Sequence, residues 1–157
     1  VGVDQHLHEA LGLGGFAGAA DALHWHLRAQ HALAAGQCLG FGHADAAQAA
    51  FGKSLALAPN DLDTRCNLAL AYALGDQSQL ALDNIRAVSE SPRAQPRHQR
   101  NELLITVLAG REKDVQSMRL EDIPATERKK LVTEARRIKA IKDPIIQARE
   151  LGLIDTH

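Results

Sequence analysis

The sequence has few aromatic residues, few cysteines and no long hydrophobic run. Its 157 residues include three Phe, one Tyr, one Trp and two cysteines. Cys38 and Cys66 lack metal-ligand spacing, so we interpret them as small packing residues, with a disulfide as the alternative. No segment approaches the roughly 18 apolar residues of a transmembrane helix. The first residues lack the basic region and apolar block of a signal peptide, although a precursor could have lost one.

The charge of the chain does not identify a class of partner. The net charge of −1 gives no indication of a nucleic-acid or membrane partner. Residues 1–78 carry three Lys/Arg against seven Asp/Glu, whereas residues 79–157 carry fifteen against twelve. Ala, Leu, Gln and Glu are abundant and β-branched runs are few, which favours helices over strands. We therefore predict an all-α protein.

Motifs for catalysis are missing. The sequence has no G-x-S-x-G, no phosphate loop and no G-x-G-x-x-G. The histidine pairs His6/His8 and His24/His26 are each spaced two residues apart, which places their members about 200° apart on a helix. Neither pair can then chelate one metal ion. We predict a protein that is not an enzyme and has no cofactor or metal; the alternative is an enzyme that uses these histidines.

A pattern that repeats every 34 residues organises the middle of the chain. Ala47 and Phe51 stand four residues apart, and Ala81 and Ile85 repeat that pair 34 residues later. The small residue lets two antiparallel helices approach closely, and the large one fills the gap one turn later. A proline follows each of these helices and ends it. The spacing resembles the tetratricopeptide pattern W-x2-L-G-x2-Y…A-x3-F…P.

This pattern predicts a right-handed α-solenoid of helix-turn-helix repeats with a C-terminal capping helix pair. The single domain 1–157 divides into an N-terminal helical segment (1–27), three repeats (28–61, 62–95 and 96–122) and the capping helices (125–153). Gly75-Asp76 and Ala109-Gly110-Arg111 are turn signals within the repeats. The third repeat is degenerate, because Arg119 stands where Phe51 and Ile85 stood. Asp143-Pro144 predicts the start of the last helix, and Gly152 its end.

The tetratricopeptide resemblance implies which residues face a partner, because the first helix of each repeat lines a concave groove in that family. The predicted partner-binding residues are Cys66, Asn67, Leu70, Leu74, Arg97, Arg100, Asn101 and Leu104. Asn67 and Asn101 hold the same place in successive repeats, where their amides can bond an extended peptide backbone. Local capping or bridging by each asparagine is the alternative. The Lys/Asn clamp of chaperone-binding repeat domains is missing, since Ala32 and Gly36 occupy its positions.

Two basic segments allow less specific interpretations. Residues 125–142 carry seven Lys/Arg opposite an apolar stripe. They lack aromatic residues to stack bases and Trp or Phe for a membrane interface, so we predict a solvated capping helix. A second cluster surrounds the loop before the third repeat: Arg86, Arg93, Arg97, His98 and Arg100. It either rims a groove for an acidic segment or is simply solvated.

The stretch 51–141 ends in a proline- and arginine-rich loop, a characteristic helix and a D-I-P turn. The motif residues are Arg100, Asn101, Leu104, Leu108, Gly110, Arg111, Asp122, Ile123 and Pro124. This pattern resembles the TadD-like family of tight-adherence (Flp) pilus assembly, from which Glu102 departs by replacing the usual Leu. The resemblance implies a periplasmic scaffold that binds the secretin or another pilus-assembly subunit, attached to the outer membrane if a lipidated precursor exists. The alternative is a cytoplasmic tetratricopeptide adaptor or secretion chaperone unrelated to pili.

Overall fold

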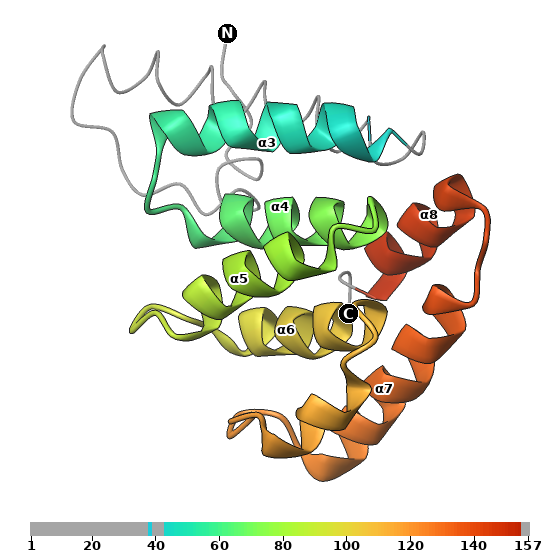
Figure 1. Ribbon diagram of the computed structural model, residues 1–157. Helices are drawn as coiled ribbons and strands as arrows, with labels where there is room; N and C mark the ends of the chain where they lie inside the picture. Colours follow the sequence, from blue (N-terminus) through green and yellow to red (C-terminus); the bar gives the residue numbers. More distant parts are fainter. Residues whose placement is uncertain (1–37, 39–42, 155–157) are drawn as a thin grey trace, which may run out of the picture.

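The computed structural model describes residue 38 and residues 43–154, with side chains described as far as residue 150 (Figure 1). Every regular element in this part of the chain is helical. The elements are α3 (Ala44–Leu57), α4 (Leu62–Leu74), α5 (Ser78–Ser89), α6 (Pro96–Leu108), the 3-10 helix η1 (Glu112–Ser117), α7 (Ala125–Lys139) and α8 (Pro144–Ile154). The all-α prediction is confirmed for these residues. The predicted N-terminal segment 1–27 lies outside them.

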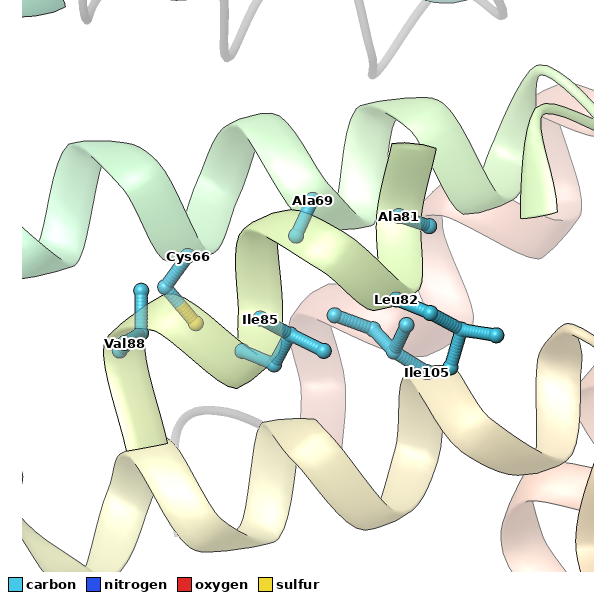
Figure 2. Packing of buried hydrophobic residues seen from close by; sticks show 7 residues of the cluster. All are labelled: Cys66, Ala69, Ala81, Leu82, Ile85, Val88 and Ile105. Atoms are coloured by element: carbon cyan, nitrogen blue, oxygen red, sulfur yellow. The ribbon is translucent and has the colours of Figure 1, made fainter. Parts of the chain in front are cut away.

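Small and large residues alternate where the helices meet, as the 34-residue pattern predicts. Ala47 and Ala81 are fully buried, and Phe51 and Ile85 are at most 2% exposed. The two pairs lie on α3 and α5, each of which packs against α4. Ile85 belongs to one apolar cluster built from α4, α5 and α6, which Figure 2 shows from close by. Each small residue therefore marks a close helix contact.

The turns form where glycine and its neighbours predict them. Asp76 has a φ of 57° and Gly110 a φ of 80°, and both follow the end of a helix. A Cβ at Gly75 would lie 2.7 Å from the side-chain nitrogen of Gln48, so a larger residue there would displace that side chain. That nitrogen donates a hydrogen bond to the carbonyl of Ala71, at 3.1 Å. The Gln48 side chain thus fastens α3 to the last turns of α4.

The degenerate third repeat does not form a second α-helix. The six-residue helix η1 takes its place, and Arg119 after it is exposed. The apolar surface that a second helix would cover on α6 is covered instead by α7 and the preceding loop. Leu120 and Ile123 from that loop and Ala135 from α7 are all at most 1% exposed. The predicted apolar stripe of the capping helix is thereby confirmed as a packing face.

The last helix begins as predicted and ends later. The Asp143 carboxylate accepts hydrogen bonds from the backbone N–H groups of Ile145 and Ile146, at 2.9 and 3.2 Å. The prediction that Gly152 ends the helix is wrong, because α8 continues to Ile154. A glycine inside a helix costs only about 1 kcal/mol relative to alanine, so it does not by itself stop one.

Helix α8 packs against α7 and also against α4, which lies much earlier in the chain. Figure 1 shows α8 beside the C-terminal end of α4. Two contacts join it to α7: Gln147 Nε2 donates to the carbonyl of Ile138 at 3.2 Å, and Arg137 pairs with Glu150 at 2.6 Å. The C-terminal helix therefore turns back toward the second predicted repeat.

Candidate partner-binding surface

Helices α4 and α6, the first helices of the second and third predicted repeats, lie side by side. Arg97 on α6 donates to the Asp63 carboxylate on α4, and these residues are 34 apart in sequence. Asn101 Nδ2 donates to Cys66 Sγ at 3.0 Å, across a separation of 35 residues. The contacts follow the period of the sequence pattern. One helix is therefore placed beside the other with a shift of one predicted repeat.

The first turns of these helices are joined by Asp63, Arg97 and His98, which we call the Asp63 clamp. His98 is 2% exposed, and its Nε2 lies 2.9 Å from Asp63 Oδ1. Its Nδ1 accepts the backbone N–H of Gln95 at 2.9 Å, so the ring proton lies on Nε2 and is donated to Asp63. Arg97 bonds both carboxylate oxygens, at 3.1 and 2.9 Å. The hydrogen bond from His98 lowers the pKa of Asp63 most; burial opposes it and Arg97 reinforces it.

An Asp–His pair is also a familiar part of catalytic sites, but here both ring nitrogens of His98 are engaged. One donates to Asp63 and the other accepts from Gln95 in the capping box of α6. A general base needs a free ring nitrogen within reach of a substrate proton. His98 would have to give up the cap to provide one. The Asp63 clamp is therefore a structural device that fixes α6 on α4.

Three of the predicted partner-binding residues are buried. Cys66, Asn101 and Leu104 are 2%, 6% and 3% exposed. They do not reach the surface, because α6 packs on α4 and α7 packs on α6 closely enough to cover them. Their assignment as contact residues is corrected accordingly: they are packing residues. Both cysteines are free thiols, and Asn101 makes the local bridge that was the alternative to peptide binding.

The other five predicted residues remain at least partly accessible. Asn67, Leu70 and Leu74 are half-buried along α4, and Arg97 and Arg100 lie on α6. We call these five residues the α4–α6 surface. Within the described part of the chain, the Asn67 side chain makes no hydrogen bond. It is a polar group with two donors and an acceptor still to satisfy, beside two partly covered leucines.

The arginines of this surface carry less free charge than the sequence suggested. Arg97 is held by Asp63 at 2.9 Å, and Arg100 Nε by Glu127 Oε1 at 2.6 Å. Arg93, which lies in the loop before α6 and outside this surface, donates to the backbone carbonyl of Asn60 in the loop before α4, at 2.7 Å. These three guanidinium groups are each partly satisfied within the fold. What these groups can still offer to a bound peptide is mainly hydrogen bonds, because little of their charge is unpaired.

A depression of about 480 Å³ opens between the first turns of α4 and α6. Its charged lining consists of Asp61, Asp63, Arg93 and Arg97, so carboxylates and guanidinium groups balance. The buried ring of His98 adds no charge in the tautomer fixed by its two hydrogen bonds. The depression is polar without a net preference for an acidic ligand. The prediction that this region captures an acidic segment thus gains no electrostatic support.

Sequence reasoning missed the Asp63 clamp, although a signal was present. Asp63 and Arg97 hold the same position of successive predicted repeats, so opposite charges stand 34 residues apart. Such charges face each other when first helices lie side by side. The contact of α8 with α4 had no comparable signal. It depends on the path of the chain after Lys142.

The described residues support neither a metal site nor a membrane-spanning helix. No group of three His, Cys, Asp or Glu side chains there could hold a metal ion. None of the described helices is long and apolar enough to cross a membrane. The N-terminal histidines lie outside the described residues. No protein-family model, curated protein or solved structure matches this sequence.

Proposed function

We propose that this chain is a non-enzymatic tetratricopeptide scaffold that binds a segment of a protein partner on the α4–α6 surface. The observation that supports this most is the set of contacts between α4 and α6, which join residues 34 and 35 apart. Helical repeats stack in this way, and each repeat contacts only its neighbours. A stack of this kind presents its first helices as a continuous surface for peptides.

The side chains of the α4–α6 surface suit an extended or helical peptide. The Asn67 amide can donate to and accept from a peptide backbone, which fixes the direction of the bound chain. Leu70 and Leu74 lie one and two turns further along α4, where they can contact apolar side chains of the peptide. Because α8 lies near the C-terminal end of α4, the N-terminal part of the surface is the more open.

The partner that the sequence motifs favour is a subunit of tight-adherence (Flp) pilus assembly, with the secretin first. What supports this is the TadD-like resemblance of residues 51–141. The structure gives several motif residues roles in folding: Arg100 pairs with Glu127, Asn101 bonds Cys66, and Ile123 is fully buried. These three motif residues therefore have structural roles, and the resemblance of the whole stretch 51–141 is what favours this partner.

The proposed location is the periplasm, with attachment to the outer membrane if a lipidated precursor exists. The second candidate is a cytoplasmic adaptor or secretion chaperone unrelated to pili. The same α4–α6 surface would serve either function, because a half-buried amide flanked by leucines and arginines suits any extended segment. The two candidates differ in the compartment and the identity of the partner.

The experiment is affinity capture with the full chain, run separately on envelope and cytoplasmic fractions of the native host. Asn67→Arg places a long charged side chain on the α4–α6 surface. Asn84→Arg is the matched control, because Asn84 is also a half-buried helical asparagine but lies on α5. We expect wild type and Asn84→Arg to capture secretin or another pilus subunit from the envelope, and Asn67→Arg to lose it.

Two results would count against the proposal. Undiminished capture by Asn67→Arg would refute the α4–α6 surface while leaving the pilus partner standing. If the wild type captures only cytoplasmic proteins, and Asn67→Arg loses them, the result supports the adaptor function and refutes the pilus function. Circular dichroism of each variant checks that its helical content is unchanged.

A further inference from the structure

The turn from α7 into α8 exposes two adjacent isoleucines. Ile145 and Ile146 are 39% and 46% exposed, and with Leu80 they are the large hydrophobic side chains that the described part of the chain leaves exposed. They lie in the first turn of α8, where Asp143 caps the helix and fixes their backbone. Figure 1 shows this turn at the outer edge of the fold. The two side chains are therefore exposed on the capped first turn of α8.

Two basic residues flank the isoleucines in the sequence. Lys142 and Arg149 are exposed, and Arg149 shares a helix face with Ile145 and Ile146 because it follows them by four and three residues. The ammonium group of Lys139 lies instead near Gly110, where its charge acts on the Glu112 carboxylate. Within the described residues, Lys142 and Arg149 have no ion-pair partner. We call Ile145, Ile146, Lys142 and Arg149 the α7–α8 corner.

The acidic groups nearby are already engaged. The Asp143 carboxylate accepts the two backbone N–H groups at the start of α8, and Glu150 pairs with Arg137 at 2.6 Å. Residues 125–150 together hold eight Lys/Arg and four Asp/Glu, a net charge of +4. Among the described residues, Lys142 and Arg149 therefore face one neighbouring carboxylate without a cationic partner, that of Asp143.

The shape of the corner favours a lipid surface over a protein. A stable protein interface buries about 800 Å² on each partner around a packed apolar centre, and two isoleucines do not provide one. A bilayer needs no complementary cavity, because apolar side chains enter the acyl boundary while Lys and Arg remain at the headgroups. Basic residues gain further from the negative potential of anionic lipids.

We propose that the α7–α8 corner docks this protein on the surface of an anionic phospholipid bilayer, with Ile145 and Ile146 inserted at the headgroup boundary. This docking is peripheral and reversible, and it is separate from partner binding on the α4–α6 surface. It needs both the apolar pair and the basic residues, because each alone gives only weak attachment.

The test is co-sedimentation of the full chain with vesicles. One set contains phosphatidylcholine mixed with phosphatidylglycerol, and the other contains phosphatidylcholine alone. We expect binding to the anionic vesicles only, and a decrease as salt screens the charges. Ile145→Ser with Ile146→Ser should lower the partition coefficient at least tenfold. Lys142→Gln with Arg149→Gln should lower it about 25-fold, at roughly fivefold for each basic residue.

Leu80→Ser is the matched control. Leu80 is exposed to the same 46% as Ile146, but it lies on α5 beside Gln79 and Asp83, which hydrogen-bond to each other. Its substitution should leave vesicle binding unchanged. Circular dichroism verifies the fold of each variant. If the double serine variant does not fold, Ile146→Trp replaces it. A blue shift of the tryptophan fluorescence of this variant on anionic vesicles reports insertion, and Leu80→Trp should show no such shift.

Several results would overturn the proposal. One is no binding to anionic vesicles at low salt, and another is equal binding to neutral vesicles. A third is binding that survives loss of both isoleucines, which would reduce the corner to a diffuse basic surface. Binding to soluble polyglutamate but not to vesicles would point to an acidic protein as the occupant instead of a membrane.

Discussion

Replacing Asp63 with alanine should lower the free energy of unfolding by about 2 kcal/mol at neutral pH. The substitution leaves the Nε2–H of His98, a side chain only 3% exposed, without its acceptor. A buried donor that loses its partner costs roughly 1–3 kcal/mol. The two bonds from Arg97 add less than about 1 kcal/mol, because that side chain is 49% exposed and its charge is screened.

The loss should depend on pH in a defined direction. The fold lowers the pKa of Asp63 below its ordinary value of 3.8, chiefly through the hydrogen bond from His98. A carboxyl group with a lowered folded pKa contributes its full stability above the unfolded pKa. That contribution disappears as pH falls through the folded pKa. The difference between wild type and Asp63→Ala should therefore be constant at neutral pH and shrink below about pH 4.

The assay is a double-mutant cycle of Asp63→Ala and His98→Ala, followed by urea unfolding monitored by circular dichroism. The expected coupling energy is about 1–2 kcal/mol, since the pair forms one charge-assisted bond from a buried donor. Asp83→Ala is the control: its carboxylate bonds an exposed glutamine on α5, and its loss should change stability by less than about 0.5 kcal/mol. Additive effects of the two substitutions, or a difference that persists undiminished at low pH, would refute the role of the Asp63 clamp.

Two further substitutions should stabilise the protein. Ser54 is fully buried on α3 and its Oγ has no hydrogen-bond partner, so Ser54→Ala should raise the free energy of unfolding by about 1 kcal/mol, measured by urea unfolding against Ser89→Ala. Burial raises the pKa of Glu102 above 4.5, so its charged form destabilises the fold as pH rises through the folded pKa. Glu102→Gln should therefore raise the free energy of unfolding at neutral pH and leave it unchanged below about pH 4. If the free energies of the variant and the wild type differ by the same amount at both pH values, the raised pKa of Glu102 is not the cause.

Local signals made most of the helices and turns predictable. The turn at Gly75-Asp76 needs a residue that tolerates a positive φ, and Asp76 stands at the predicted position. Pro96 starts α6 because the first helical position needs no N–H donor. Asp143 caps α8 through its own side chain. Each of these signals involves neighbours in sequence, so it can be interpreted without knowledge of the packing.

The candidate surface was predicted less well because it depends on how closely helices approach. The repeat position of Leu104 or Cys66 identifies the face of the helix, but not whether a neighbour covers that face. The structure shows that α6 and α7 cover them. The same holds for the arginines, because Arg97 and Arg100 are partnered by acidic residues 34 and 27 positions away.

The contrast between Asn67 and Asn101 shows how much the neighbouring helix decides whether an asparagine side chain is bonded within the fold. The two asparagines occupy the same repeat position, yet Asn101 is buried and bonded to Cys66, 35 residues earlier. The residue 35 positions before Asn67 is Ala32, whose side chain has no atom that can accept a hydrogen bond. Asn67 therefore cannot form the equivalent bridge, and its amide stays available on a half-buried face. A partner that binds across α4 would supply the bonds that the fold gives to Asn101.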